Sequence, residues 1–405
     1  MRKLIFVNRY FYPDHSATSQ MLSDLAFALA EGGGDEVHVV ASRQAYDNPK
    51  ASLAAFEQIQ GVRVHRVWTS RFGRQNLAGR AFDYLSFYLT AFAKLLALAG
   101  RGDTVIAKTD PPLISVVAAL AARVKSAELV NWAQDLFPEV AAALGVKLAS
   151  GPAYRLLRRL RDYSLRAARA NIAIGERMRE RLLAAGVPAG RVHVIHNWAD
   201  AEQIQPIAPA DNPLRHAWGL DGKFVVGYSG NLGRGHDYAT LLDAATALRG
   251  QPDIAFLIIG GGAKLDALKQ AAAERALDNF VFQPYQPRAS LSASLSAADV
   301  HIVSLKPELE GLIVPSKFYG IAAAGRPVLF IGDPSGEIPC LIAEIGCGHA
   351  VAEGQAEVLR DKILALSTQE DVRLAMGNTG RASLVSTYGR QAALARWRTI
   401  LNLSQ

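Results

Sequence analysis

Short apolar runs alternate with segments of helical periodicity along the first half of the chain. The runs that we expect to form strands are residues 4–7, 36–41, 62–67, 104–107, 128–132, 170–174 and 192–195. Between several of them, apolar positions three and four residues apart predict helices over 19–31, 82–99, 112–124, 153–168 and 176–185. Strands that alternate with helices are typical of a parallel sheet covered by helices.

The same alternation begins again after residues 197–223, which carry prolines and glycines and little strand pattern. The expected strands of this second series are 224–228, 255–259, 280–283, 300–303, 327–331 and 348–351, and the expected helices are 238–248, 264–276, 291–297, 316–324, 338–345 and 355–366. We therefore predict an α/β fold of two doubly wound, Rossmann-like domains, 1–200 and 201–385, that face a central cleft. A C-terminal helix within 386–405 is expected to pack back on the first domain.

No apolar stretch in the sequence reaches the length expected of a membrane-spanning helix. The longest candidates, 84–93 and 111–122, fall well short of the roughly 20 residues that are needed. The apolar stretch near the N-terminus ends at Asn8, which fits a first strand better than a signal peptide. The only cysteines, Cys340 and Cys347, indicate no disulfide framework. We therefore expect a cytoplasmic protein that does not cross a bilayer.

The positive net charge favours an anionic partner. The formal net charge is +7 and the isoelectric point is near 9.4, values that suit nucleic acid, acidic lipid or a phosphorylated small molecule. Residues 154–182 contain nine arginines and three acidic residues, interleaved with apolar ones. Such a segment suits an anionic membrane surface, so we expect peripheral attachment to the inner face of the plasma membrane, with a solvated basic helix as the alternative. No helix-turn-helix, zinc-finger or RNA-binding motif supports nucleic acid as the partner.

Polar residues follow the expected strands of the first half, where ligands of open α/β sheets bind. The candidates for binding an acceptor are His15, Ser16, Asp110, Gln134 and Asp135. Asp135 comes directly after a buried strand, where a carboxylate is unexpected unless it faces a binding site, and it is our candidate general base or hydroxyl ligand. Ordinary caps and turns at Ser16 and Asp135 are the alternatives.

The second half contains glycine turns, basic residues and carboxylates at the corresponding places. Residues 227–237 combine four glycines with an arginine before a helix, a pattern that lets backbone N–H groups and a guanidinium approach a diphosphate. It is neither a P-loop nor the dinucleotide-binding pattern. Lys317 falls at a helix start, where its charge opposes the helix dipole unless an anion binds there. The donor-site candidates are Gly230, Asn231, Gly233, Arg234, Gly261, Tyr285, Glu308, Glu310, Ser316, Lys317 and Glu337.

Five segments of the chain together resemble retaining glycosyltransferases of family 4, in the branch of WbuB-like and WcaI-like enzymes of O-antigen and capsule synthesis. The segments are AQDLFPE (133–139), VIHNWAD (194–200), GYSGNLGRGHD (227–237), PSKFYGIAAAGRPV (315–328) and FIGDPSGE (330–337). The resemblance implies a GT-B fold, an acceptor on the N-terminal domain, a nucleotide sugar on the C-terminal domain, and neither a cofactor nor a required metal. It also implies roles for individual residues of the site.

By this resemblance, Arg234 and Lys317 hold the donor diphosphate, and the region of Glu310 faces the donor sugar, with Glu308 and Glu310 as alternatives for the first of two family glutamates. The catalytic candidates are Asp135, Arg234, Glu310 and Lys317. The sequence departs from the family pattern at Gly320, where a glutamate is usual, so that Glu337 becomes the candidate for sugar or ribose hydroxyls. Asn231 replaces a basic residue of the family. No group of residues with metal-ligand spacing is visible, so the basic residues are expected to stabilise the leaving diphosphate.

The sequence thus predicts an enzyme that moves a sugar from a nucleotide diphosphate, with UDP as the expected nucleotide, to a polyprenyl-diphosphate-linked saccharide with retention of configuration. The resemblance favours an N-acetylated deoxyhexose such as L-fucosamine as the sugar, in the synthesis of O-antigen, capsule or exopolysaccharide. The alternatives are a transferase of the GDP-fucose type, a nucleotide-sugar epimerase of the same fold, and a sensor that binds nucleotide sugars without turnover.

Overall fold

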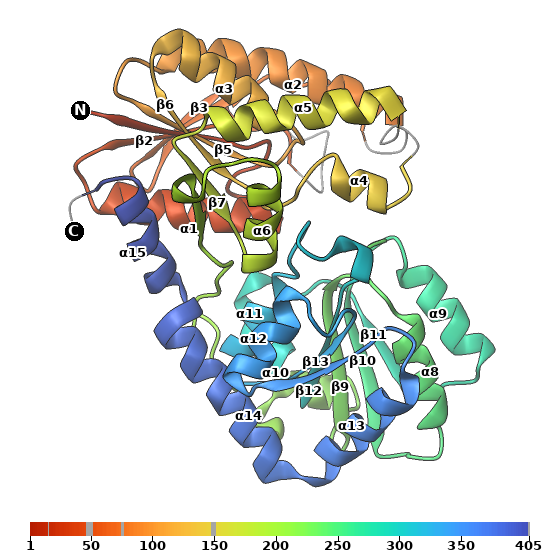
Figure 1. The fold of residues 1–405 in the computed structure, drawn as a ribbon. Helices are drawn as coiled ribbons and strands as arrows, with labels where there is room; N and C mark the ends of the chain where they lie inside the picture. The colour runs from red at the N-terminus through yellow and green to blue at the C-terminus, as the bar shows by residue number, and fades with distance from the viewer. Residues whose placement is uncertain (15, 46–51, 74–76, 147–150, 404–405) are drawn as a thin grey trace. The chain divides into compact units, whose positions relative to one another are not determined.

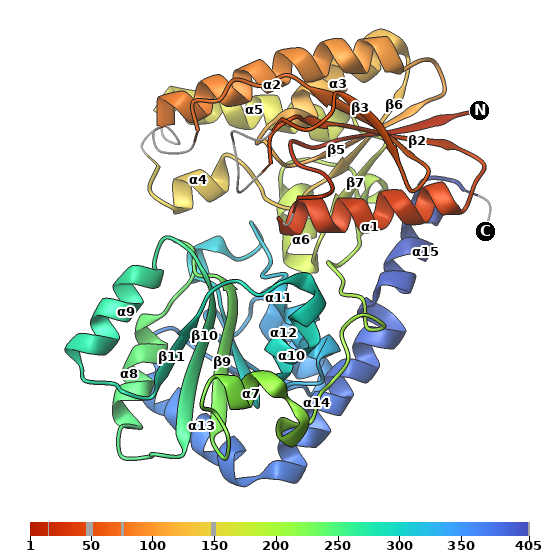
Figure 2. The ribbon, with the colours of Figure 1, turned by 180° about the vertical axis from the view of Figure 1, so that it is seen from behind.

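The computed structural model describes residues 1–14, 16–45, 52–73, 77–146 and 151–403. The chain divides into two compact units, one formed by Met1–His196 with Leu394–Gln405 and the other by Asn197–Ala393. Each unit has a sheet of largely parallel strands with helices on its two faces (Figures 1 and 2). The predicted α/β class with two Rossmann-like domains is confirmed.

The sheet of the first unit has eight strands in the order β3-β4-β2-β1-β5-β6-β7-β8. Their bounds are Lys3–Val7 (β1), Glu36–Ser42 (β2), Phe56–Ile59 (β3), Val62–Val67 (β4), Thr104–Lys108 (β5), Glu128–Trp132 (β6), Ala170–Ala173 (β7) and Val192–Val194 (β8). The edge strand β3, which the sequence analysis missed, pairs antiparallel with β4 through a two-residue turn at Gln60 and Gly61, both with positive φ. Its short, half-exposed pattern gave no apolar run to detect.

Helices α2 and α3 cover one face of this sheet, and α5 lies beside them, whereas α1 and the end of α15 lie on the other face (Figures 1 and 2). The helices are Ala17–Glu31 (α1), Leu77–Leu98 (α2), Ile114–Lys125 (α3), Glu139–Ala143 (α4), Gly151–Ala167 (α5), Glu176–Ala184 (α6) and Arg390–Ile400 (α15). The end of α15 packs on this unit through Trp397, whose ring meets that of Trp132 edge-on at 4.9 Å.

Helix α2 begins earlier than the sequence pattern indicated. It was expected over 82–99, and it starts at Leu77. By length and composition alone, residues Ala78–Leu98 could cross a membrane, with a mean hydropathy of 1.3 in the most apolar window. Only 22% of that window is buried, so this is not a fully enclosed core helix. The expectation that no segment reaches spanning length was therefore wrong for this helix, although length and composition are weak grounds for a membrane span.

The sheet of the second unit is entirely parallel, in the order β11-β10-β9-β12-β13-β14. The strands are Phe224–Asn231 (β9), Ile254–Gly261 (β10), Phe280–Gln283 (β11), Val300–Ser304 (β12), Val328–Ile331 (β13) and Gly348–Val351 (β14). The helices are Pro213–Ala217 (α7), Ala239–Ala247 (α8), Leu265–Glu274 (α9), Leu291–Ser296 (α10), Lys317–Ala323 (α11), Glu337–Ile345 (α12), Ala356–Thr368 (α13) and Glu370–Ser383 (α14). A π-helical turn, Leu384–Tyr388, leads towards α15.

A buried ion pair fixes the start of β9. Arg215 donates to Asp299 at 3.1 Å, and the same carboxylate oxygen accepts the backbone N–H of Val225 at 2.7 Å. Both charged side chains are almost fully buried. Because neither charge can return to water without unfolding, each depends on the other for compensation.

Asp299→Ala is expected to lower the free energy of unfolding by about 3–5 kcal/mol, because it leaves the Arg215 guanidinium buried without its counter-charge. Urea denaturation followed by circular dichroism would measure the change. The matched control is Asp221→Ala, which removes the solvent-exposed pair with His216 and should cost less than about 1 kcal/mol. Equal losses in the two variants would contradict this account of β9.

Candidate functional site

The strand order in the second unit predicts a ligand-binding opening at the carboxyl ends of β9 and β12. From β9 the chain proceeds outward through β10 and β11, and then returns to the other side of β9 with β12. The loops after these two strands therefore diverge to opposite faces of the sheet and leave an opening between them. The glycine-containing segment 227–237 comprises the end of β9 and the turn after it, and the segment 306–320 follows β12. The structure thus brings together the two segments that carried most of the predicted donor residues.

Lys317, the first residue of α11, reaches back to β9. Its Nζ donates to the Tyr228 hydroxyl at 2.5 Å and lies 3.9 Å from the centre of the Tyr228 ring. Burial lowers the pKa of this ammonium to about 7. In the part of the chain that the structure describes, Lys317 forms no ion pair with a carboxylate. A partly buried cation without a counter-charge is suited to an anionic ligand.

Glu310 and Glu308 differ sharply in environment. Glu310 is buried, and its Oε2 accepts the backbone N–H of Glu337 at 3.1 Å. A Cβ atom on Gly336 would overlap the Glu310 carboxylate, so this glycine leaves the space that the carboxylate occupies. Glu308 is exposed and lies 3.6 Å from the Lys306 ammonium. Of the two glutamates that the sequence left as alternatives, Glu310 is therefore the one held in place at the start of α12.

The glycines after β9 and β10 allow the two backbones to touch. Gly230, Gly260 and Gly262 have positive φ, and a Cβ atom on Gly260 would overlap the Gly230 carbonyl. This backbone packing explains the glycines without any ligand. Arg234, in contrast, is exposed and makes no hydrogen bond or ion pair within the described residues, so its guanidinium is available to a ligand.

The remaining donor candidates lie around the same edge of the sheet. The Tyr285 ring is exposed and lies beside Gly261, where an added Cβ would come within 3.1 Å of it. Asn231 is exposed, whereas Gly233 and Ser316 are partly buried. Gly320 is on α11, and a Cβ there would meet only Leu295, at 3.6 Å. Glu337 is buried as the first residue of α12, and its charge helps to raise the pKa of Tyr319.

His236 is a site residue that sequence reasoning missed. Its Nδ1 lies 2.5 Å from the Ser304 carbonyl oxygen, and its ring meets the Tyr228 ring edge-on. Burial, with the nearby Lys317 charge, lowers the pKa of the imidazole to about 3. The ring is therefore neutral, with Nδ1–H donating to the carbonyl, which leaves Nε2 as an acceptor. Its position inside the glycine turn was the signal that could have identified it.

The acceptor candidates of the first unit lie at the carboxyl ends of β5 and β6. The Arg9 backbone N–H donates to the Asp110 carbonyl at 2.6 Å, and the Gln134 N–H donates to the Thr109 hydroxyl at 3.3 Å. These bonds join the segments that follow β1, β5 and β6. Ser16 is at the start of α1 and does not cap it through its side chain. The predicted residue His15 lies outside the described residues.

Asp135 follows β6, with its side chain accessible to solvent but surrounded by protein. Burial raises the pKa of its carboxyl to about 6, the nearby Asp110 charge adds to this rise, and Lys108 opposes it. A carboxyl that titrates near neutrality is suited to accept a proton from a hydroxyl.

Lys108, the last residue of β5, was also missed. It is fully buried, and its Nζ lies 3.4 Å from the centre of the Trp132 ring. This Nζ has no hydrogen-bond partner among the described residues. Burial lowers the pKa of the amine well below its ordinary value, and the charges of Asp135 and Asp24 oppose that change. A lysine that ends an apolar strand was the available signal in the sequence.

Within the described ranges, no group of three or more His, Cys, Asp or Glu side chains is arranged to hold a metal ion. The groups that converge on the two sheet edges are instead lysines, an arginine and carboxylates. They can bind a phosphorylated ligand, orient hydroxyl groups and accept a proton.

Two protein-family models match the chain, one in each half. Residues 17–198 match the model described as "Glycosyl transferase 4-like domain", and residues 212–383 match the model described as "Glycosyl transferases group 1". The two matches together account for most of the chain. They confirm the resemblance to family 4 glycosyltransferases.

The chain is also similar to curated proteins. It is 34% identical over 256 residues to the "Probable glycosyltransferase WbjE" of Pseudomonas aeruginosa, a match that covers 63% of this chain and 64% of that protein. It is 31% identical over 247 residues to WcaI of Escherichia coli (strain K12), named for colanic acid biosynthesis, with 59% of this chain and 60% of that protein covered. The chain thus spans less than two thirds of the length of these two relatives.

Solved structures share the fold across the whole chain. HepE of Anabaena, in complex with UDP and glucose, has a TM-score of 0.74 at 17% identity, covering 99% of this chain and 100% of that one. WaaG, a glycosyltransferase involved in lipopolysaccharide biosynthesis, has a TM-score of 0.67 at 14% identity, with 98% and 99% covered. With a family model matched in each half and this shared fold, the chain belongs to the family 4 glycosyltransferases of the GT-B type.

Proposed function

We propose that the protein transfers a sugar from a UDP-linked donor, bound by the second unit, to a polyprenyl-diphosphate-linked saccharide bound by the first. The observation that carries this proposal is Lys317, a partly buried ammonium at the β9 and β12 edge with no carboxylate paired to it in the described residues. A nucleoside diphosphate supplies the missing negative charge. The proposed setting is synthesis of O-antigen, capsule or exopolysaccharide at the cytoplasmic face of the membrane, in line with the names of the relatives.

In the proposed reaction, the bond between the anomeric carbon and the diphosphate oxygen breaks, and an acceptor hydroxyl oxygen bonds to that carbon with retention of configuration. Lys317 and Arg234 would neutralise the charge that develops on the departing diphosphate. Glu310 and Glu337 would hold hydroxyl groups of the sugar or ribose, and Tyr285 would stack on the base. Asp135 would orient the acceptor hydroxyl and accept its proton.

UDP is the proposed nucleotide because HepE has been solved with UDP and with UDP-glucose. A GDP-linked donor is the second candidate. It is favoured by a relative from Mycobacterium tuberculosis (strain CDC 1551 / Oshkosh), named a GDP-mannose-dependent alpha-mannosyltransferase, which is 27% identical over 301 residues and matches 73% of this chain and 70% of that protein. For the sugar itself, an N-acetylated deoxyhexose such as L-fucosamine remains our proposal.

Incubation with the donor alone separates transfer from the other activities of this fold. A transferase consumes the donor only when the acceptor is present. Release of an epimer or free sugar without acceptor would make the protein an epimerase or hydrolase, and binding without turnover in either mixture would make it a sensor.

Lys317→Ala is expected to weaken UDP binding by at least about tenfold, because one charge-assisted contact contributes roughly 1.5–3 kcal/mol. A thermal-shift titration would measure it: ligand at 100 times its Kd stabilises the wild type by about 2.7 kcal/mol. Lys317→Arg should retain binding and lose the fall in affinity above about pH 7 that deprotonation of Lys317 imposes on the wild type. Lys269→Ala, an exposed lysine of α9, is the control. Unchanged binding in Lys317→Ala would remove the main support for the proposal.

Glu310→Gln is expected to lower kcat by roughly 100-fold or more, the size found when one stabilising polar group is removed from an active site. The amide can still accept the Glu337 N–H, so folding should be preserved. Glu308→Gln is the matched control and should change kcat by less than about twofold, because Glu308 is exposed. Release of UDP in the presence of acceptor gives the rates. The reverse order of effects would assign the role to Glu308.

Asp135→Asn is expected to lower transfer and remove the acid limb of the pH profile, which in the wild type should fall as the pH drops through about 6. Stability should move the other way. A carboxyl with a raised pKa in the folded state binds more protons than in the unfolded state between its ordinary value and about 6, so stability falls as pH rises through that window.

The melting temperature of Asp135→Asn should therefore equal or exceed that of the wild type at neutral pH, with no such advantage at acid pH. Asp361→Asn, an exposed carboxylate of α13, is the control for both measurements. An unchanged acid limb in Asp135→Asn would assign the proton transfer to another group.

A further inference from the structure

The outward stripe of α2 is apolar along nearly its whole length. Its exposed positions follow helical spacing and consist of Ala78, Ala81, Phe82, Leu85, Leu89, Ala93 and Ala97. Phe82, Leu85 and Leu89 are 59%, 52% and 64% exposed. A surface helix of a globular protein normally places polar residues on this side. The opposite side of α2 carries Phe87, Ala91 and Leu95, which are buried in the core of the first unit.

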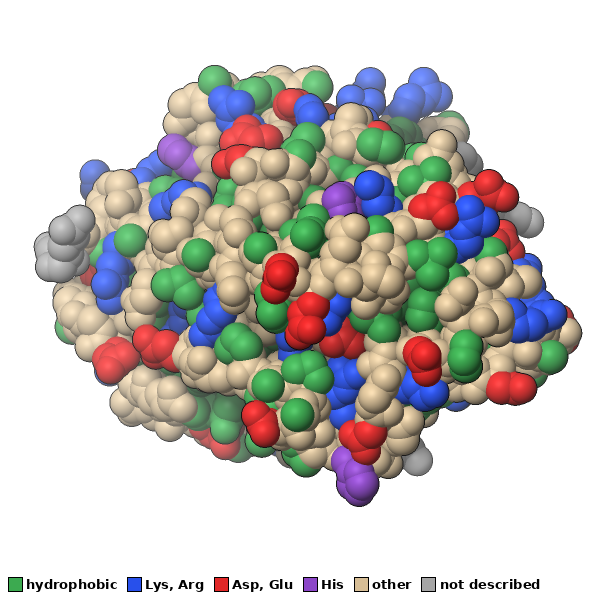
Figure 3. Space-filling view, turned by 90° about the horizontal axis from the view of Figure 1, so that it is seen from below, with side chains coloured by type: hydrophobic (Ala, Val, Ile, Leu, Met, Phe, Trp, Pro, Cys, Tyr) green, Lys and Arg blue, Asp and Glu red, His purple; other side chains and the backbone are tan. Residues whose placement is uncertain are grey.

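Two neighbouring helices extend this apolar stripe. Leu120 and Val124 of α3 and Leu156 and Leu160 of α5 are large, exposed hydrophobic residues. Helices α2, α3 and α5 lie together on one side of the first sheet in both ribbon views (Figures 1 and 2). We refer to the exposed residues Trp68, Phe72, Phe82, Leu85, Leu89, Leu120, Val124, Leu156 and Leu160 as the apolar face. The face in Figure 3, by comparison, has acidic and basic side chains interspersed among scattered apolar ones.

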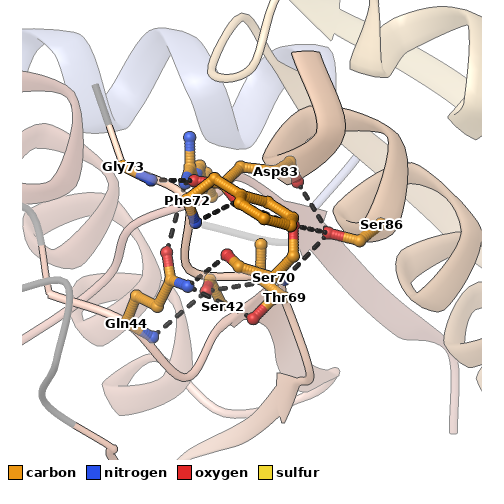
Figure 4. Close-up of polar contacts among 9 residues, drawn as sticks. Ser42, Gln44, Thr69, Ser70, Phe72, Gly73, Asp83 and Ser86 are labelled. Carbon is orange, nitrogen blue, oxygen red and sulfur yellow. Dashed lines mark hydrogen bonds and ion pairs between the residues drawn. The ribbon is translucent and has the colours of Figure 1, made fainter. Parts of the chain in front are cut away.

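A buried polar network fastens two exposed aromatic residues beside α2. Asp83, itself buried, accepts the Ser70 hydroxyl at 2.7 Å and the backbone N–H groups of Phe72 and Gly73 at 3.0 Å each (Figure 4). Phe72 is 65% exposed and its ring lies 5.7 Å from that of Phe82. The network therefore fixes the conformation of a segment whose aromatic ring is exposed to solvent. Ordering this segment costs conformational entropy, and exposure of the ring to water gives no compensating gain.

Trp68 is also held in place with its side chain exposed to solvent. Its side chain is 61% exposed, and the Thr90 hydroxyl of α2 donates to its backbone carbonyl at 2.9 Å. In the same network, the side-chain amide of Gln44 donates a hydrogen bond of 2.6 Å to the carbonyl of Ser70, the residue after Thr69 (Figure 4). Tryptophan is the residue type most suited to the boundary between lipid headgroups and acyl chains.

Basic side chains surround the apolar face. Arg71, Arg123, Arg155 and Arg159 are exposed and form no ion pair within the described ranges. The nine arginines of 154–182, expected to form one basic face, are in fact divided between α5, the turn before β7 and α6. Five of them are paired with carboxylates: Arg158 and Arg161 with Glu139, Arg169 with Glu128, Arg177 with Glu180 and Arg179 with Glu176. The unpaired charge therefore belongs mainly to α5 and its neighbours.

We infer that the apolar face binds an anionic lipid bilayer, with its side chains at the acyl boundary and the surrounding arginines on headgroup phosphates. Charge complementarity and the aromatic residues select a membrane over a protein partner. Helix α2 lies in the plane of the interface and does not span the bilayer, because withdrawal from the first unit would expose Phe87, Ala91 and Leu95. This inference deepens the proposed function, on which it rests for the lipid-linked acceptor.

The apolar face is connected to the acceptor edge through Arg9. This arginine follows β1, and its guanidinium lies 3.7 Å from the Asp83 carboxylate and donates to Gln44 at 3.2 Å. Its backbone N–H donates to Asp110. A protein seated by this face would hold the carboxyl end of β1 close to the headgroups, where the diphosphate of a lipid-linked acceptor lies.

The test is flotation with vesicles of phosphatidylcholine and phosphatidylglycerol. The double variant Leu85→Glu with Leu89→Glu is expected to reduce vesicle binding by at least about tenfold, because it replaces two side chains that gain from leaving water with charged ones. Val372→Glu with Leu374→Glu, at exposed apolar positions of α14, is the matched control and should bind as the wild type does. Equal binding by both double variants, or no binding by the wild type, would overturn the inference.

Fluorescence supplies a second measurement on the wild type. Vesicles with brominated acyl chains should quench Trp68, and Trp68→Phe should lose most of that quenching, because Trp132, Trp198 and Trp397 are buried and the half-buried Trp218 belongs to the second unit. Absence of quenching would contradict insertion of this face. A loss of vesicle binding in Arg155→Gln with Arg159→Gln, but none in Leu85→Glu with Leu89→Glu, would reduce the contact to charge alone and also contradict it.

Controls keep this inference separate from the proposed function. Leu85→Glu with Leu89→Glu should retain the UDP thermal shift and transfer to a water-soluble, short-chain acceptor at the wild-type rate. If UDP binding and transfer fail in the wild type while it still floats, the proposed function is wrong and the membrane face stands. If the double variant changes only from dimer to monomer in size-exclusion chromatography and still binds vesicles, the face covers a second copy of the chain.

Discussion

Parallel strand pairing is the constraint on which both candidate sites depend. Each parallel connection requires a crossover, so the segments that follow the strands collect at one edge of each sheet. The direction of the crossovers changes at β1 in the first unit and at β9 in the second. Polar residues can occupy the opening that this change creates without disturbing the apolar strands beneath them. The chemistry of this chain therefore lies at the strand ends and in the segments that follow them.

Each of the two sheets has, at the carboxyl ends of its strands, a lysine whose charge no carboxylate of the described residues balances. Lys317 contacts a tyrosine hydroxyl and ring, and Lys108 contacts a tryptophan ring, yet neither forms an ion pair within the described residues. Burial disfavours the charged form of both amines. An anion that enters beside Lys317 restores the charged form and gains a strong contact in a low-dielectric environment. This arrangement favours a phosphorylated ligand over a neutral one, and it does not depend on residues that would hold a metal ion.

The sequence was sufficient for the fold class because most apolar runs alternate with segments of helical periodicity. It also placed Lys317, Glu310 and Asp135 in the segments that follow buried strands. It could not choose between Glu308 and Glu310, because the choice depends on the Glu337 N–H, 27 positions away. His236 and Lys108 were missed for a similar reason, since burial by segments distant in the sequence is the main cause of their lowered pKa values. The ion pairs of the basic segment 154–182 with Glu139 and Glu128 could not be predicted, because their partners come from distant parts of the sequence.

Helix α2 differs from an ordinary surface helix, because it is not amphipathic. Both of its sides are apolar, one filling the core and the other exposed beside Trp68 and Phe72. Exposed leucine and phenylalanine lower solubility and offer no gain in water, so their placement is costly unless a non-aqueous phase covers them. The buried Asp83 network adds an ordering cost to the same region. Under the membrane-binding inference, an anionic bilayer offsets both costs and pairs with the exposed arginines near the face.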